Sequence, residues 1–466
     1  MKIFRYILFI LPLCIVASSC KKYLELNAPK DQLLDKLVFT TDESATAAVV
    51  GIYNQMVDNP YEFAAGATTK YVSLSADELD YTVSDQDYEE YENNALMPRN
   101  AYLSLLWSPC YKYIYQSSAC IAGIEKSGTI TAGVKQQLLG EAKFLRAFCY
   151  FYLVNFFGEV PLITGTDFEQ NAIQPKTAEQ KVYEYIVTDL KDAKALLSSG
   201  YVTGEKVRAN SWSAAALLAR VYLYMQDWEK AGIAANEVIQ SGLYLPLSHP
   251  DSVFLKNSKE AIWQLMPTNS SINTREGVDF IPAVSPSALP FFVIKEELLE
   301  SFEEEDIRRK SWIGIKTVEG KDYAYPYKYK VNRTVGEIKE YYTVFRLAEQ
   351  YLIRAEARAH LGQYDGSRED VNAIRKRAGL SGITAAGQAG LLAAIERERR
   401  IEFMFEWGHR WFDLKRTPAI DVSGKTRADE VLSLIKPNWR STAVIYPVPQ
   451  AEIDANPFLK QSPGYE

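Results

Sequence analysis

The sequence predicts a mainly α-helical protein built from paired helices, with two irregular insertions that carry a little β structure. Apolar side chains recur at helical spacing on both sides of each insertion, as in helices that bury one face. In residues 213–243, small and large apolar residues recur at the spacing of a tetratricopeptide helix pair. Such a pair leaves an apolar face uncovered when it stands alone, so we expect several pairs to stack into one body.

Other stretches repeat this pattern less completely. Residues 140–157 open a pair whose second helix, 178–197, is delayed by a loop rich in Gly, Pro and Thr. Residues 351–374 form a weaker unit, with Arg358 where an aromatic residue is usual. Residues 391–408 are expected to pack against helices nearby.

Charge and aromatic bulk are concentrated most densely in residues 396–416. The spacing of the apolar residues predicts one helix with a buried stripe. On that helix Glu396 would reach Arg399 and Arg400, which lie three and four residues further along. The stripe consists of Ile401, Met404, Phe405, Gly408 and Phe412.

The first residues have the pattern of a secretory signal. Lys2 and Arg5 precede an apolar run at 7–16, and small residues stand directly before Cys20. The run is shorter than the ~20 residues that span a bilayer. Small residues beside a cysteine resemble a bacterial lipobox, so we expect removal of residues 1–19 and lipidation of Cys20.

The net charge argues against a nucleic-acid partner, and the number of cysteines argues against complete disulfide pairing. The net charge of −7 provides no basic footprint for a nucleic-acid backbone, so no nucleic-acid partner is expected. Removal of the signal and lipidation of Cys20 leave Cys110, Cys120 and Cys149. An odd number cannot pair completely, and we expect three buried thiols.

Motifs of catalysis and metal binding are absent from the sequence. There is no nucleophile elbow, no Cys-x-x-Cys, no His-x-x-x-His and no phosphate-binding glycine loop. His249, His360 and His409 lie far apart and lack neighbouring ligands. Acidic runs such as 303–306 are typical of solvated helix faces. We therefore expect no enzyme activity, no cofactor and no metal.

The composition instead favours ligand binding, with 30 tyrosines and 8 tryptophans, many of them in the insertions at about 57–100 and 244–341. Flat rings cover the apolar faces of sugars while polar side chains bind the hydroxyls, and the same residues also suit a peptide. The tyrosines of the second insertion alternate as on a strand, which fits either a binding surface or a half-buried core strand. The candidate ligand-binding residues are Asp77, Glu78, Tyr81, Tyr88, Tyr91, Asn93, Trp312, Tyr323 and Tyr325.

Two stretches of the C-terminal region, 391–466, carry a family resemblance. Residues 399–416 read RRIEFMFEWGHRWFDLKR and residues 445–465 read IYPVPQAEIDANPFLKQSPGY. Both resemble the SusD/RagB family of nutrient-binding lipoproteins. The resemblance implies a single SusD-like body over 20–466, in which helix pairs form the supporting wall and the insertions contact the ligand.

The function that this resemblance implies is nutrient capture at the outer membrane. The lipid-anchored, surface-exposed protein would bind an oligosaccharide and deliver it to a SusC-like TonB-dependent transporter barrel. Two alternatives remain open: a receptor for peptides rather than glycans, and an envelope scaffold that assembles proteins through its repeats.

The lipid anchor yields the first testable prediction. Cys20→Ala removes the thiol that would carry the lipid, so we expect an unprocessed or unanchored product. Membrane fractionation after a high-salt wash measures this, with Cys110→Ala as the matched control. Retention of the Cys20 variant in the outer membrane would exclude the lipobox.

Overall fold

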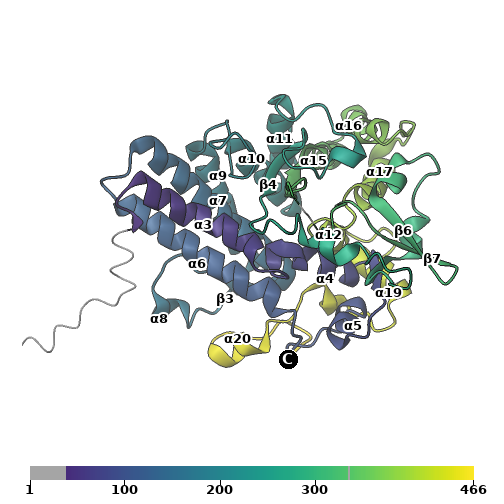
Figure 1. Ribbon diagram of the computed structural model, residues 1–466, viewed down its shortest axis with the longest axis horizontal. Coiled ribbons are helices and arrows are strands. Elements are labelled where there is room, and N and C mark those ends of the chain that lie inside the picture. Colours follow the sequence, from purple (N-terminus) through teal and green to yellow (C-terminus); the bar gives the residue numbers. More distant parts are fainter. Residues whose placement is uncertain (1–37, 334–335) are drawn as a thin grey trace, which may run out of the picture.

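The computed structural model describes residues 38–333 and 336–466, so the signal segment and Cys20 lie outside the described residues. Helices α3, α6 and α7 run along one side of the molecule, and the later helices extend the stack toward the C-terminal half (Figure 1). The long helices are α3 (Asp42–Asp58), α6 (Ser104–Lys126), α7 (Ala132–Phe157), α9 (Glu179–Leu196), α10 (Ser211–Tyr224), α11 (Trp228–Gln240), α15 (Leu347–His360), α16 (Tyr364–Arg377) and α17 (Gly387–Glu402).

Shorter helices occupy the insertions and the C-terminal region, and the described residues also form four short pairs of antiparallel strands. The short helices are α4 (Thr68–Ser75), α5 (Gln86–Glu92), α8 (Phe168–Asn171), α12 (Arg275–Phe280), α13 (Glu296–Leu299), α14 (Ile307–Trp312), α18 (His409–Arg416), α19 (Arg427–Ile435), α20 (Gln450–Ala455), and the single turns η2 (Phe63–Ala67), η3 (Pro250–Ser252) and η4 (Ser441–Val444). The strand pairs are β1 (Leu79–Tyr81) with β5 (Phe292–Ile294), β2 (Val160–Pro161) with β3 (Lys176–Thr177), β4 (Ala261–Leu265) with β8 (Tyr342–Arg346), and β6 (Ile313–Val318) with β7 (Lys321–Pro326).

The helix pair predicted at 213–243 is confirmed as α10 and α11. Side-chain caps define both starts, because the first N–H groups of a helix lack partners within it. The Asn210 side chain accepts a hydrogen bond from the Ser213 N–H at 2.9 Å. Asp227 accepts one from the Lys230 N–H at 3.2 Å, at the predicted turn.

The weaker pairs are confirmed too. Helix α7 packs against α9 across the delaying loop, and α15 packs against α16 and α17. Arg358 takes the place of the usual aromatic residue by joining α15 to α16 through hydrogen bonds. Its guanidinium donates to the Gly366 carbonyl at 3.1 Å and to the Asp370 carboxylate at 2.9 Å.

The single helix predicted for residues 396–416 is wrong. Helix α17 ends at Glu402, and α18 begins only at His409. Between them the chain turns through left-handed conformations, with φ of 56° at Phe405, 48° at Trp407 and 73° at Gly408. Such conformations cost roughly 1–2 kcal/mol for residues other than glycine, so tertiary contacts must compensate.

The charges of this stretch also pair differently from the prediction. Glu396 binds Arg410 and Arg427 instead of Arg399 and Arg400. Arg399 binds Asp413, with N–O distances of 2.7 and 3.0 Å. Because the helix breaks, partners come from other elements rather than from the next helical turn.

A buried ion cluster connects the end of α17 to three other parts of the chain. Glu402 is fully buried and accepts hydrogen bonds from Arg308, Arg346 and Arg377. These cations hold the pKa of Glu402 well below its usual range despite the opposing effect of burial. Arg346 also donates twice to Glu406, each time at 2.8 Å.

The three cysteines of the body are buried free thiols, as predicted. Burial raises the pKa of the Cys120 thiol to about 12. A thiol held in its neutral form is a weak nucleophile, so Cys120 acts as a small apolar core residue.

The ion cluster yields a stability prediction. Glu402→Gln leaves three buried guanidinium groups without their shared carboxylate, and loss of one partner of a buried ion pair costs about 3–5 kcal/mol. We expect the free energy of unfolding to fall by about that amount, measured with denaturant. Glu396→Gln, at a partly exposed ion pair, is the matched control. Equal effects of the two substitutions would contradict the role given to the cluster.

Candidate functional site

Strands β1 and β5 bring the two insertions together. Their antiparallel register places Tyr81 opposite Phe292. The pairing continues one residue further, where the Thr82 N–H donates to the Phe291 carbonyl at 3.0 Å. Side chains from residues 61–102 and 275–292 therefore share one surface.

Tyrosines pack closely beside this junction. The rings of Tyr71 and Tyr102 stack with centroids 4.7 Å apart and an interplanar angle of 10°. Tyr88 lies between Tyr81 and Phe292, with centroid distances of 5.9 and 5.4 Å. Tyr71 is buried, whereas Tyr81, Tyr88 and Tyr102 remain half-buried and reach the surface.

Two cations and a carboxylate extend the aromatic cluster. The Lys70 ammonium lies 4.5 Å from the Tyr61 ring centroid and 5.9 Å from that of Tyr88. The Arg275 guanidinium also lies over the Tyr61 ring, 3.9 Å from its centroid. Asp279 binds both cations, at 3.2 Å from Lys70 and 3.0 Å from Arg275. Burial lowers the pKa of Lys70, and Asp279 partly offsets this effect.

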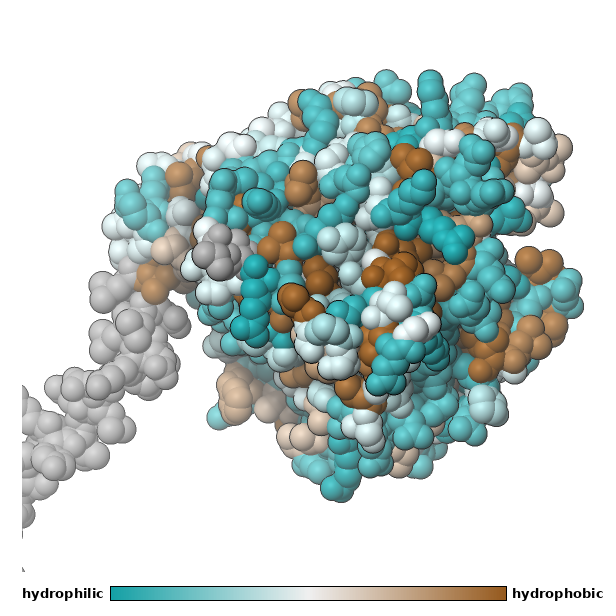
Figure 2. Space-filling model, turned by 45° about the vertical axis from the view of Figure 1, so that its right-hand side comes forward, coloured by the Kyte–Doolittle hydropathy of each residue, from teal (hydrophilic) through white to brown (hydrophobic). Residues whose placement is uncertain are grey.

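We call the partly exposed rings of this surface the tyrosine seam: Tyr61, Tyr81, Tyr88 and Tyr102. Tyr61 is 39% exposed, which is unusual for a ring that belongs to a core, and Phe291, directly before β5, is 58% exposed. Figure 2 shows hydrophobic residues interrupting the hydrophilic surface on the side that carries β6 and β7 in Figure 1.

A polar cavity of about 470 Å³ adjoins the seam at Tyr81. Asp85 caps α5 and accepts a hydrogen bond from the Tyr102 hydroxyl at 2.8 Å, which connects the cavity to the stacked rings. The cavity is lined by Tyr81, Ser84, Asp85, Gln86, Glu89, Glu90, Asn93, Ala95 and Asn438. Carboxylates and amides beside rings provide acceptors and donors for a hydroxyl-rich ligand.

Three of the candidates from the first insertion are half-buried at this site: Tyr81, Tyr88 and Asn93. Three others are buried, so the expectation that they face a ligand is corrected. Asp77 is held by Arg410 at 2.6 and 2.8 Å, and Tyr91 is fully buried against Tyr71. Glu78 is 1% exposed and accepts hydrogen bonds from the Ser73 hydroxyl and the Phe405 N–H.

The expectation of an exposed Trp312 is wrong. The ring is 0% exposed, and its indole N–H donates to the Pro250 carbonyl at 2.9 Å. The Lys328 ammonium lies 4.2 Å from the ring centroid. An aromatic residue in an insertion was expected at the surface, but here the insertion has a core of its own.

Tyr323 and Tyr325 are half-buried on β7, on the face opposite the buried Ala324 and Pro326. The alternation expected of a strand is confirmed. Strand β7 packs against β5, so the hairpin stands next to the junction of the insertions. Tyr325 lies over Gly314, where an added Cβ would be 2.2 Å from its ring.

Five residues of this surface were not among the predicted site residues: Tyr61, Lys70, Tyr102, Arg275 and Asp279. Arg275 and Asp279 stand four residues apart on α12, a spacing that predicts an ion pair on one helix face. Tyr61 and Lys70 carried no such signal. Their contact with Arg275 and Asp279 depends on the β1–β5 pairing, which joins distant parts of the chain.

No group of three or more His, Cys, Asp or Glu residues suited to hold a metal ion occurs within residues 38–333 and 336–466. In the same part of the chain, no helix combines the length and apolar character needed to cross a bilayer.

Comparison with known proteins identifies the family. A family model described as "SusD family" matches residues 295–465, and one described as "Starch-binding associating with outer membrane" matches residues 22–223. SusD-like protein P25 of Formosa agariphila is 24% identical over 99% of this chain and 98% of the relative. A SusD-like protein of Bacteroides ovatus is 25% identical over 88% and 81%. The chain belongs to the SusD/RagB family.

Solved structures show the same fold as this SusD/RagB chain. A SusD superfamily protein from Bacteroides vulgatus has a TM-score of 0.80 at 20% identity, covering 91% of this chain and 99% of the other. A laminarin-binding SusD-like protein has a TM-score of 0.77 at 24% identity, with the same coverages. The predicted mainly helical, SusD-like fold is therefore confirmed.

The burial of Trp312 generates the next prediction. Trp312→Ala removes a large buried ring and leaves the Pro250 carbonyl without its donor, so we expect a stability loss of about 3–5 kcal/mol. Denaturant unfolding measures it, and Tyr323→Ala on the half-exposed face of β7 is the control. A loss below about 1 kcal/mol for Trp312→Ala would place the ring at the surface.

Proposed function

We propose that this SusD/RagB chain is an outer-membrane receptor that binds oligosaccharides along the tyrosine seam. The single observation that carries the proposal is the set of partly exposed rings beside Lys70 and Arg275, two cations that share the Asp279 carboxylate. Sugar rings present C–H faces that stack on aromatic rings, and hydroxyl rims that need donors and acceptors. The seam and the adjoining cavity supply both kinds of contact.

The tyrosines are already ordered by one another, which favours binding. Tyr88 contacts Tyr81, Tyr102 and Phe292, and Tyr102 is also fixed through its hydroxyl to Asp85. A ligand that stacks on such rings has little side-chain entropy to remove. Asn93, Tyr323 and Tyr325 extend the proposed contact surface on either side.

Two comparisons support a glycan over other ligands. One neighbour of the same fold binds laminarin, and one matching family model is described as starch-binding. The latter description also includes association with the outer membrane. In the proposal, a lipid on Cys20 holds the receptor there, and the bound glycan is passed to a SusC-like TonB-dependent transporter.

The proposal is for binding without hydrolysis. A general acid needs a carboxyl with a raised pKa in reach of the ligand. Burial raises the pKa of Glu78 and of Glu276 to about 7, yet their side chains belong to residues only 1% and 5% exposed. Neither carboxyl can contact a glycan on the seam in this conformation.

Two other functions need separate tests. The rings and polar groups of the seam also suit a peptide, so the receptor could take peptides as its nutrient. A repeat scaffold for envelope assembly would capture a protein partner without any small ligand. A screen of the soluble body against laminarin oligosaccharides, starch oligosaccharides and short peptides distinguishes these functions.

The seam generates a binding prediction. Tyr81→Ala removes a ring that joins the seam to the polar cavity, and we expect the affinity for the glycan found in the screen to fall about 10- to 30-fold. Isothermal titration calorimetry measures the affinity, and circular dichroism verifies the fold.

The matched control is Tyr115→Ala, a 47% exposed tyrosine on α6 outside the seam. It should bind the glycan like the parent protein. Unchanged affinity of a folded Tyr81→Ala variant would show that the glycan binds elsewhere.

A further inference from the structure

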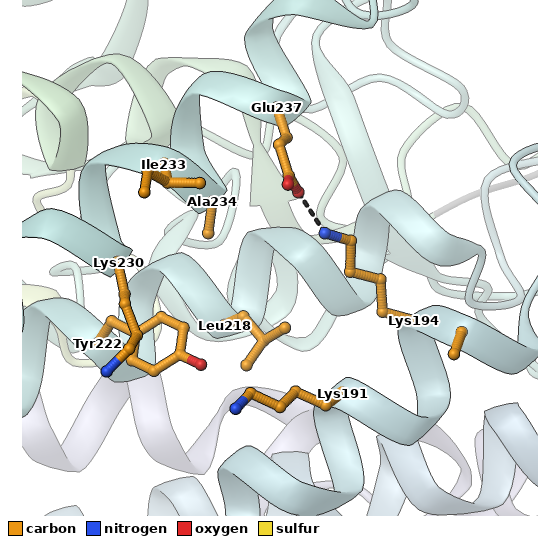
Figure 3. A pocket seen from close by; sticks show the side chains of 9 residues that line it. Lys191, Lys194, Leu218, Tyr222, Lys230, Ile233, Ala234 and Glu237 are labelled. Carbon is orange, nitrogen blue, oxygen red and sulfur yellow. Dashed lines mark hydrogen bonds and ion pairs between the residues drawn. The ribbon is translucent and has the colours of Figure 1, made fainter.

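A second cavity, of about 390 Å³, lies on the helical repeats instead of the insertions (Figure 3). Helices α9 and α11 form its sides, and α10 forms its floor. It is lined by Lys191, Lys194, Ala195, Leu218, Tyr222, Lys230, Ile233, Ala234 and Glu237.

The floor and one wall of this repeat cavity are aliphatic. Leu218 and Ala234 are buried, whereas Ile233 is 55% exposed at the rim. An exposed isoleucine beside buried apolar side chains forms a small surface that an aliphatic side chain would cover favourably.

The charged residues of the cavity carry a net positive charge in a protein whose formal charge is −7. Three lysines face a single glutamate. Lys194 is paired with Glu237, and Lys230 with Asp227. Lys191 has no ion-pair or hydrogen-bond partner within the described residues, and no carboxylate stands three or four residues from it on α9.

Tyr222 supplies a second unpartnered polar group. Its side chain is largely buried, but its hydroxyl is open to the cavity and has no hydrogen-bond partner in the part of the chain that the structure describes. A tyrosine with a buried ring and an open hydroxyl can offer that hydroxyl to a ligand. Figure 3 shows the Lys191 ammonium and the Tyr222 hydroxyl extending into the cavity. Both groups can donate a hydrogen bond to the same acceptor.

We propose that the repeat cavity binds an acidic segment of a partner protein. A Glu or Asp carboxylate of the segment accepts hydrogen bonds from Lys191 and Tyr222, and an adjacent aliphatic side chain covers Leu218 and Ile233. The carboxylate complements the positive rim, and the apolar wall favours a peptide over a sugar, because the Tyr222 ring is already faced by Lys230 at 5.6 Å. This site is separate from the tyrosine seam and does not rest on glycan binding.

The test uses two peptide probes that differ only in charge: acetyl-Leu-Glu-Leu-amide and acetyl-Leu-Gln-Leu-amide. Each is titrated into the full mature chain while the methyl resonance of Ile233 is followed by NMR, after assignment with Ile233→Val. We expect a saturable shift with the Glu peptide and at least about 5-fold weaker binding of the Gln peptide.

Lys191→Met should reduce the affinity for the Glu peptide to that for the Gln peptide. The affinity for the Gln peptide itself should not change. Tyr222→Phe keeps the ring and removes the hydroxyl, so it should reduce the difference in affinity between the Glu peptide and the Gln peptide. The matched control is Lys181→Met, an exposed lysine on α9 that does not line the cavity, and it should keep the full difference.

Three results would overturn the proposal. The first is equal binding of the two peptides to the parent chain, or no saturable shift of Ile233. The second is an effect of Lys181→Met as large as that of Lys191→Met, which would indicate general charge attraction. The third is a saturable shift with sodium glucuronate at lower concentration than with the Glu peptide, which would identify a sugar acid as the occupant.

Discussion

The buried carboxylate of Glu402 is the constraint on which the rest of the structure depends. Three arginines from α14, the end of β8 and the end of α16 converge on it, and Arg346 extends the cluster to Glu406. These bonds stop α17 at Glu402 and hold the left-handed turn that follows. A helix continuing through this stretch would move Glu406 away from Arg346 and leave buried charges unpaired, which costs more than the strained backbone.

The left-handed turn that replaces a continuous helix after Glu402 positions the candidate site. The Phe405 N–H, freed from helical bonding, donates to the Glu78 carboxylate directly before β1. Strand β1 then pairs with β5 and brings Tyr81 opposite Phe292. An ion cluster in the core thus fixes the register of two insertions that lie more than 200 residues apart in sequence, as the pairing of Asp80 with Val293 illustrates. The proposed contact surface therefore depends on charged groups that are buried away from it.

Local signals explain which parts of this architecture the sequence could predict. The pair α10–α11 follows from apolar spacing and two caps, Asn210 and Asp227, whose effects reach only three residues along the chain. Glu402 has partners 25, 56 and 94 residues away, so its pairing could not be predicted from helical spacing. The prediction for Trp312 was wrong for the same reason. Composition suggested a ligand-binding ring, but its indole N–H bonds the Pro250 carbonyl 62 residues away, inside the core. Tyr81, Tyr88 and Asn93 lie at the site because β1 ends at Tyr81 and α5, which carries Tyr88, ends before Asn93.

The helical repeats stabilise the fold, whereas the insertions carry the proposed glycan-binding surface. Helix pairs bury their apolar faces against one another, so their residues are constrained by packing. Tyr61 of the seam lies in an insertion and is 39% exposed, so it contributes less to that packing than a buried ring does. Under the proposed function, substitution at such a ring would change the ligand preference while the helical wall and the Glu402 cluster keep the fold. In the repeats, Lys191 and Tyr222 offer donors to the proposed repeat cavity from helices that bury another face against their neighbours. Each surface can therefore change its specificity without disturbing the other.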